Sequence, residues 1–213
     1  MKLEWPDWTE EIVIIVASGP SASEVPLELM KDRARFMAVK DGWRLCPWAD
    51  VLYGCDHHWW EAHRGIPEFL GLRMAYDPQT ITKYRGMPFL KVNVKKQREQ
   101  FMFGEIGNVG WGGNSGFHAI NLVAQFGAKL IALVGFDMRI DNGKHFFGDH
   151  KYTKDRPSAP NCLRWAKIID SQAPVLTKMG ITVVNCSLVS TITAFPKVDF
   201  RDFVKSVAWG KAA

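Results

Sequence analysis

Two unbroken aliphatic runs, each closed by a glycine-containing turn, limit the folds open to this 213-residue chain. The first run, Ile12 to Ala17, ends at Ser18-Gly19-Pro20-Ser21, and the second, Leu130 to Val134, ends at Gly135-Phe136-Asp137. Strands buried on both faces of a parallel sheet read as continuous apolar runs, whereas half-exposed strands alternate apolar and polar residues. The two runs therefore predict central strands of a parallel sheet.

Helical patterns stand between and after these runs, as parallel strands require. One helix is predicted to begin at Asn114 or Ser115, whose side chains can accept amide hydrogens, and to end near Gly127. A second helix is predicted from Cys162 to Met179, followed by a strand from Ile181 to Asn185. Further short strands are predicted over residues 36–40, 50–55 and 89–94, and a short helix over 27–31. The alternation predicts an α/β fold with a Rossmann-like, mostly parallel sheet flanked by helices.

The length and the absence of repeats or linkers predict one nucleotide-binding domain over residues 1–213. Its core is expected over residues 12–186, with a surface helix or tail from residue 199. No stretch approaches the roughly 20 apolar residues of a membrane-spanning helix, and the first residues do not resemble a secretory signal. We therefore expect a soluble, cytoplasmic protein. Its four cysteines form no Cys-x-x-Cys pair and are expected to be free thiols.

The formal net charge of +5 favours an acidic partner. Lysine and arginine are spread along the chain without a long basic run, so a phosphate-bearing small ligand accounts for the charge. Nucleic acid is retained as the alternative partner. The aromatic residues Trp43, Trp48, Tyr53, Trp59 and Trp60 form a cluster in the sequence that is either core or a stacking surface for rings.

Two loops are candidates for holding the phosphate of a nucleotide. Ligands bind outside the carboxyl ends of the strands in open α/β sheets, and glycine with a serine hydroxyl at a helix start suits a phosphate. The candidates are Gly19-Pro20-Ser21 and Asn114-Ser115-Gly116, with Asp137 at the end of the second aliphatic run as a further candidate. Neither loop is a Walker loop or a Gly-x-Gly-x-x-Gly turn. Ser21 or Ser23 is alternatively expected to cap the short helix that follows.

A third loop carries the candidate base. Histidine accepts a proton from a hydroxyl near neutral pH, which makes His145 and His150 the candidates. Neighbouring cations could balance the charge of a departing phosphate: Lys144, Lys151, Lys154 and Arg156. A solvated basic loop and a metal site made by His145, Asp149 and His150 are the alternatives.

The remaining polar clusters have weaker functional interpretations. Asp56-His57-His58 is expected to be binding or structural, and His63 and His118 are expected to be structural. The chain has no Asp-x-Asp, the motif with which many sugar transferases hold a metal beside a nucleotide diphosphate, so metal-free chemistry is favoured. No Gly-x-Ser-x-Gly elbow indicates a serine hydrolase.

The order of these motifs resembles a known family. An apolar strand ending in Gly-Pro-Ser, an Asn-Ser-Gly helix start, a strand ending in Gly-Phe-Asp and a His-Phe-Phe-Gly-Asp-His loop are similar to the bacterial sialyltransferases of glycosyltransferase family 42. They also resemble the related MptE-like group, and short proteins of this kind in phage and prophage genomes make a phage origin an expectation. The resemblance covers residues 12–185 in patches.

The resemblance implies a site. A CMP-linked sugar would lie across Gly19-Pro20-Ser21 and Asn114-Ser115-Gly116, and no metal or cofactor beyond the donor substrate would be needed. A histidine of the third loop would act as base, with His150 matching the family spacing more closely than His145 because of one extra residue, Asp149. Lys151 and Tyr152 would assist the leaving phosphate. Lys40-Asp41 stands where the family often has a donor-contacting asparagine.

Three functions follow as expectations. The first is metal-independent sugar transfer from a nucleotide-activated, possibly CMP-linked, donor to an unknown acceptor. The second, implied by the MptE-like relatives, is pyrophosphoryl transfer from ATP with Mg²⁺ held by Asp137 or Asp149. The third is a non-catalytic phage accessory protein that binds a nucleotide, or a host protein through an exposed Trp-rich segment. The oligomeric state stays open.

Overall fold

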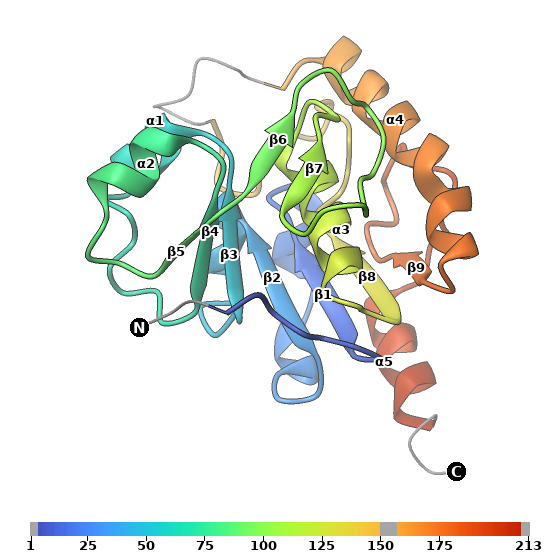
Figure 1. Cartoon of the computed structure of the whole chain (residues 1–213). Helices are drawn as coiled ribbons and strands as arrows, with labels where there is room; N and C mark the ends of the chain where they lie inside the picture. Colours follow the sequence, from blue (N-terminus) through green and yellow to red (C-terminus); the bar gives the residue numbers. More distant parts are fainter. Residues whose placement is uncertain (1–3, 150–156, 210–213) are drawn as a thin grey trace.

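The computed structural model describes residues 4–149 and 157–209, and its centre is a seven-stranded sheet with only parallel neighbours (Figure 1). The strand order is β5-β4-β3-β2-β1-β8-β9. The strands span Ile12–Val16 (β1), Arg35–Val39 (β2), Val51–Gly54 (β3), Leu72–Ala75 (β4), Phe89–Lys91 (β5), Leu130–Val134 (β8) and Thr182–Asn185 (β9). Two further strands, β6 (Asn93–Lys95) and β7 (Asn108–Gly110), form a separate parallel pair. The predicted parallel α/β fold is confirmed.

Helices cover both faces of the main sheet. The α-helices span His57–Ala62 (α1), Pro78–Lys83 (α2), Ser115–Gln125 (α3), Ala159–Lys178 (α4) and Phe200–Trp209 (α5). Three short 3-10 helices span Pro20–Glu24 (η1), Leu27–Met30 (η2) and Lys40–Arg44 (η3). α3 and α4 pack on one face together with β6 and β7, while α1, α5 and the 3-10 helices pack on the other.

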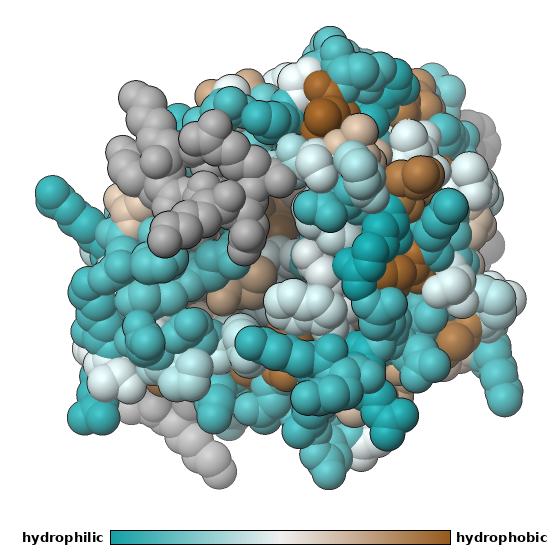
Figure 2. All heavy atoms as spheres, turned by 90° about the horizontal axis from the view of Figure 1, so that it is seen from above, coloured by the Kyte–Doolittle hydropathy of each residue, from teal (hydrophilic) through white to brown (hydrophobic). Residues whose placement is uncertain are grey.

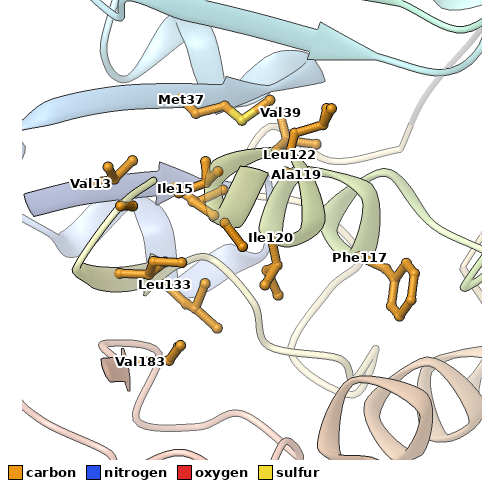
Figure 3. Packing of buried hydrophobic residues seen from close by; sticks show 14 of the residues in the cluster. Val13, Ile15, Met37, Val39, Phe117, Ala119, Ile120, Leu122, Leu133 and Val183 are labelled. Carbon is orange, nitrogen blue, oxygen red and sulfur yellow. The ribbon is translucent and has the colours of Figure 1, made fainter. Parts of the chain in front are cut away.

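The aliphatic run of β1 is continuous because its two sides enter two different cores. Val13 and Ile15 point toward α3, where Ile120 lies (Figure 3). Ile14 and Val16 belong to the core on the opposite face, and the last four side chains of β1 are fully buried. A strand in the middle of a parallel sheet has no solvent side, so each position favours an apolar residue.

Three of the five clustered aromatic residues are core, which corrects the expectation of an exposed contact surface for these rings, whereas Trp43 and Trp48 are half-buried. Tyr53, Trp59 and Trp60 are fully buried. The indole N–H of Trp60 donates to the Gly54 carbonyl at 2.9 Å, and that of Trp59 donates to Asp41 at 2.7 Å. The indoles of Trp59 and Trp60 therefore satisfy their polar atoms inside the protein, which removes their need for solvent contact.

β4 has no counterpart among the predicted strands because a charged residue interrupts its apolar pattern. Arg73 in β4 is buried, and its guanidinium donates to the carbonyl oxygens of Gly65, Ile66 and Phe69 at 2.5–3.0 Å. A buried guanidinium is tolerated when carbonyl oxygens occupy its donors. The carbonyl oxygens that accept these hydrogen bonds belong to the loop after α1, so the sequence pattern of the strand itself does not reveal them.

Two other local predictions need correction. The expected helix over 27–31 is the 3-10 helix η2, with a separate 3-10 helix, η1, before it. Neither Ser21 nor Ser23 caps η2: its N-cap residue is Pro26, which makes no side-chain cap bond. The predicted strand over 89–94 divides into β5 and β6, which belong to different sheets. The break falls at the fully buried Val92, whose N–H bonds to the Ala75 carbonyl.

All four cysteines are free thiols, as expected. Among the described residues, no helix combines the length and the apolar character needed to cross a membrane.

Candidate active site

A cavity of about 550 Å³ lies at the carboxyl ends of the parallel strands. β1 stands between β2 and β8, so the order of the strands reverses at this point. Open α/β sheets bind ligands in the crevice at such a switch point. Figure 2 looks down on this end of the molecule, whose surface is mostly hydrophilic. The cavity is lined by parts of all three candidate loops, including Gly19, Asn114, Ser115, Gly116, Asp137, Lys144 and His145.

The first loop is tied to the end of β8 rather than to its own helix. The Ser21 N–H donates to one carboxylate oxygen of Asp137 at 2.9 Å, and the Ser21 hydroxyl donates to the other. The Gly19 N–H donates to the Gly135 carbonyl at 2.9 Å. Asp137 therefore acts on the loop that borders the cavity, and its carboxylate holds that loop in place.

Gly19 has no room for a side chain, which gives a testable prediction. A Cβ at Gly19 would lie 2.5 Å from the Gly135 carbonyl oxygen and 2.7 Å from the Asp137 carboxyl carbon. We expect Gly19→Ala to lower the free energy of unfolding by about 1–3 kcal/mol, because the backbone of two loops must move apart. Urea unfolding measures the change. Gly104→Ala is the control, since a Cβ there meets nothing within 4 Å; equal stability of the two variants would contradict the prediction.

The second loop begins α3 as predicted. Asn114 is the N-cap residue, and its side chain accepts the Phe117 N–H at 2.9 Å. The Ser115 hydroxyl lies 3.0 Å from the Cys55 sulfur. Burial raises the pKa of the Cys55 thiol to about 11, so it stays protonated at neutral pH and is a poor nucleophile.

The third loop reaches back to the first. His145 Nδ1 lies 2.9 Å from the Ser18 hydroxyl oxygen, and the imidazole stacks on Phe147 with ring centroids 5.1 Å apart. The Phe146 N–H donates to the Ser18 carbonyl at 3.0 Å. Because Ser18 and His145 both line the cavity, the fold brings this histidine to the switch point. Five further residues predicted in this loop lie outside the described residues: His150, Lys151, Tyr152, Lys154 and Arg156.

An ion pair that the sequence pattern did not identify completes the cavity wall. The Lys40 ammonium contacts the Asp56 carboxylate between the ends of β2 and β3. Burial works against both charges, yet the neighbouring Cys55 and Asp56 raise the pKa of Lys40, and Lys40 lowers the pKa of Asp56. Both groups therefore remain charged at neutral pH.

The backbone of Lys40 supports a role at the site. Its φ of +48° lies in the left-handed region, where a non-glycine residue is strained, and such residues cluster at functional sites. Asp56 occupies the N-cap position of α1 without capping it, since its side chain bonds to Lys40. The sequence offers one signal for this ion pair: a lysine at the end of a strand and an acidic residue after the next strand. The two residues have no fixed spacing, so the pattern does not form a motif.

His118 is buried and hydrogen-bonded, which agrees with the structural role predicted for it, and it also borders the cavity. It lies fully buried in α3, with Nδ1 2.8 Å from the Tyr53 hydroxyl and Nε2 2.6 Å from the Trp111 carbonyl. A carbonyl can only accept, so Nε2 carries the proton and Tyr53 donates to Nδ1. Burial lowers the pKa of His118 to about 4, and the ring is neutral near pH 7.

The carboxylates proposed for magnesium are engaged elsewhere. Asp137 accepts both bonds from Ser21, and Asp149 pairs with Lys144 at 3.2 Å. Within residues 4–149 and 157–209, no three or more His, Cys, Asp or Glu side chains form a group that could hold a metal ion. Besides hydroxyls, amides and the His145 imidazole, the described wall of the cavity carries the Lys40–Asp56 ion pair and further charged side chains, which are Asp137, Arg139, Lys144 and Arg164.

The fold and the cavity define a doubly wound α/β protein with a polar cavity at its switch point. Similar solved structures are those of a sialyltransferase. The enzyme CstII from Campylobacter jejuni with the substrate analogue CMP-3FNeuAc has a TM-score of 0.54 at 11% identity, covering 88% of this chain and 86% of that chain. CST-II with a trisaccharide acceptor and CMP has the same TM-score at 14% identity, again covering 88% and 86%.

These similarities establish the fold. The protein has the parallel α/β fold of these sialyltransferases, over most of both chains. No family model and no curated protein matches the sequence. The expected phage origin stays a prediction.

Proposed function

We propose that this chain transfers a sugar from a nucleotide-activated donor to an acceptor hydroxyl without a metal. The nucleotide lies in the cavity at the switch point, with its phosphate against residues 19–21 and 114–116. A histidine of the third loop accepts the proton of the acceptor. We assign this role to His145, because its imidazole lines the cavity, and His150 stays a prediction.

One observation carries the proposal: three loops that are far apart in the sequence meet around a single cavity at the switch point of the sheet. The second lies at the start of α3, where the first backbone amides of a helix lack intrahelical partners and suit a phosphate. The first borders the cavity through Gly19, while Asp137 accepts both donors of Ser21. The third supplies an imidazole, the group that suits proton transfer near neutral pH. A cavity of about 550 Å³ falls within the size range of small-molecule and cofactor sites.

The similar structures support a cytidine nucleotide. CstII was solved in complex with CMP and with the substrate analogue CMP-3FNeuAc. The cavity of this chain lies at the carboxyl ends of its parallel strands, and its described residues form no cluster of side chains that could hold a metal ion beside a diphosphate. CMP is therefore the first ligand to test.

The test is a thermal-shift titration of the full chain with CMP, CDP, UDP, GDP and ATP, each with and without Mg²⁺. A ligand that binds only the folded protein stabilises it by about 2.7 kcal/mol at 100 times its Kd. We expect CMP or CDP to raise the melting temperature equally with and without Mg²⁺. A shift with ATP that requires Mg²⁺ would instead favour pyrophosphoryl transfer, and the absence of any shift would contradict both.

Binding alone does not establish transfer. The second step is to incubate the chain with CMP-linked and UDP-linked sugars and to follow release of the free nucleotide, with and without candidate acceptor glycans. Acceptor-dependent release in the presence of a metal chelator supports the proposal. A nucleotide that binds tightly while no donor is ever turned over would favour the non-catalytic accessory function.

A further inference from the structure

Two tryptophans that no sequence motif identified lie on the cavity wall. Trp111 follows β7, and Trp165 lies in the first half of α4. Both are partly exposed, whereas the other large aromatic ring on the described part of the wall, Phe136, is buried. A partly exposed indole in a cavity offers a flat apolar face to a ligand ring.

The backbone of Trp111 is held in place before any ligand binds. Its carbonyl oxygen lies 2.6 Å from Nε2 of the buried His118 and also accepts the Gly113 N–H at 2.5 Å. Its own N–H donates to the Arg98 carbonyl. Its ring lies 6.2 Å from the His118 ring, centroid to centroid, and the Lys96 ammonium lies 5.9 Å from the indole centroid. A side chain that already packs on such neighbours loses less entropy when a ligand ring contacts it.

Trp165 borders the second loop. A Cβ added at Gly113 would lie 2.7 Å from the Trp165 indole nitrogen, and Gly113 has a φ of +78° that suits glycine. Gly113 directly precedes Asn114-Ser115-Gly116, the segment proposed to hold the phosphate. A nucleobase is joined to its phosphate through one ribose, so an aromatic wall beside the phosphate loop lies within reach of the base.

A polar side chain accompanies the tryptophans. Asn161 lies one turn before Trp165 on α4, at the i, i+4 spacing that places two residues on one face of a helix, and it lines the same cavity. The amide of asparagine offers both a donor and an acceptor. This combination matches a nucleobase, which has a flat face to stack and an edge to bond.

We propose that Trp111 and Trp165 form the stacking platform for the nucleobase of the donor and that Asn161 reads the edge of the base. The inference rests on the proposed nucleotide site and adds its base subsite. It assigns base recognition to α4 and to the loop after β7, away from the loops at the ends of β1 and β8.

The test compares two ligands that differ only in carrying a base. Isothermal titration calorimetry gives the Kd of CMP and of ribose 5-phosphate for the wild-type chain, Trp111→Ala and Trp165→Ala. We expect each substitution to weaken CMP about 5- to 150-fold, the range for loss of one base–aromatic stack, and to leave ribose 5-phosphate unchanged. Trp165→Phe keeps a ring and should retain most of the CMP affinity.

The control is Trp48→Ala. Trp48 is also partly buried and has a lysine ammonium, that of Lys31, 5.3 Å from its ring centroid, but it does not line the cavity. Trp48→Ala should therefore leave the Kd of CMP and the Kd of ribose 5-phosphate unchanged. Because an alanine variant could lose its fold, Asn161→Ala, at an exposed position, provides a second measurement: it should reduce the differences in affinity among CMP, UMP and AMP.

The outcomes separate the two proposals. If the wild-type chain binds none of these nucleotides, the proposed function is wrong. If it binds CMP and both alanine variants are folded with unchanged affinity, the nucleotide site stands and the base platform is wrong. Equal weakening of CMP and ribose 5-phosphate would also overturn the platform, because the effect would then lie on the phosphate loop.

Discussion

His145→Ala is expected to lower the rate of sugar transfer by about 10²- to 10⁴-fold, the usual contribution of a positioned general base. The imidazole lines the cavity, lies 2.9 Å from the Ser18 hydroxyl and is stacked on Phe147, so the ring has a defined orientation at the switch point. The loss should appear in kcat. Affinity for the nucleotide should change little, because the phosphate is assigned to the loops at residues 19–21 and 114–116.

The measurement is nucleotide release from the donor found in the screen, at saturating donor and acceptor, together with the Kd for CMP. His58→Ala is the matched control, since His58 is exposed and does not line the cavity. His150→Ala is measured beside it. If His145→Ala keeps the wild-type rate while His150→Ala loses it, the base is His150 and the assignment made here is wrong.

Acid is expected to destabilise the protein through His118 well before the carboxylates titrate. Burial lowers the pKa of His118 from 6.5 to about 4 in the folded chain. Between pH 6.5 and pH 4, His118 is therefore protonated in the unfolded state and neutral in the folded state. The stabilisation is complete above pH 6.5 and is lost progressively as the pH falls toward 4. The full loss is about 3 kcal/mol, from about 1.4 kcal/mol for each pKa unit.

Urea unfolding at intervals between pH 6.5 and 4.5 measures this effect with little interference. His63, whose pKa is raised chiefly by its hydrogen bond to Asp41, contributes stability that is already complete below pH 6.5 and is lost as the pH rises. Asp56 has a lowered pKa and begins to contribute a loss only as the pH falls through about 4. The slope in this window should therefore become shallower in His118→Gln. Titration of the His118 ring by NMR near pH 6.5 in the folded wild type would contradict the prediction.

The secondary structure around the site is largely encoded locally. The run from Ile12 to Val16 is apolar at every position because both faces of β1 are buried. Asn114 starts α3 by accepting the Phe117 amide, and Gly127 follows the helix with a φ of +90°. Period, capping and turn chemistry act over a few residues, so these features can be predicted from the sequence.

The contacts that build the site depend on the order of the strands, which local sequence does not encode. Ser21 meets Asp137 and Ser18 meets His145 because β1 pairs with β8 at the centre of the sheet, although more than 100 residues separate the partners. The Lys40–Asp56 pair likewise requires β2 and β3 to be neighbours.

The sequence by itself determined where the apolar strands of this protein end and its loops begin. It also determined which glycines and hydroxyls follow those strands, and that histidines lie in a later loop. Only the tertiary structure decided that Trp59 and Trp60 are core, while Trp111 and Trp165 line the cavity. An indole has the same propensity and hydrophobicity in all four places. Its exposure is set by the elements that pack against it, and those elements come from distant parts of the chain.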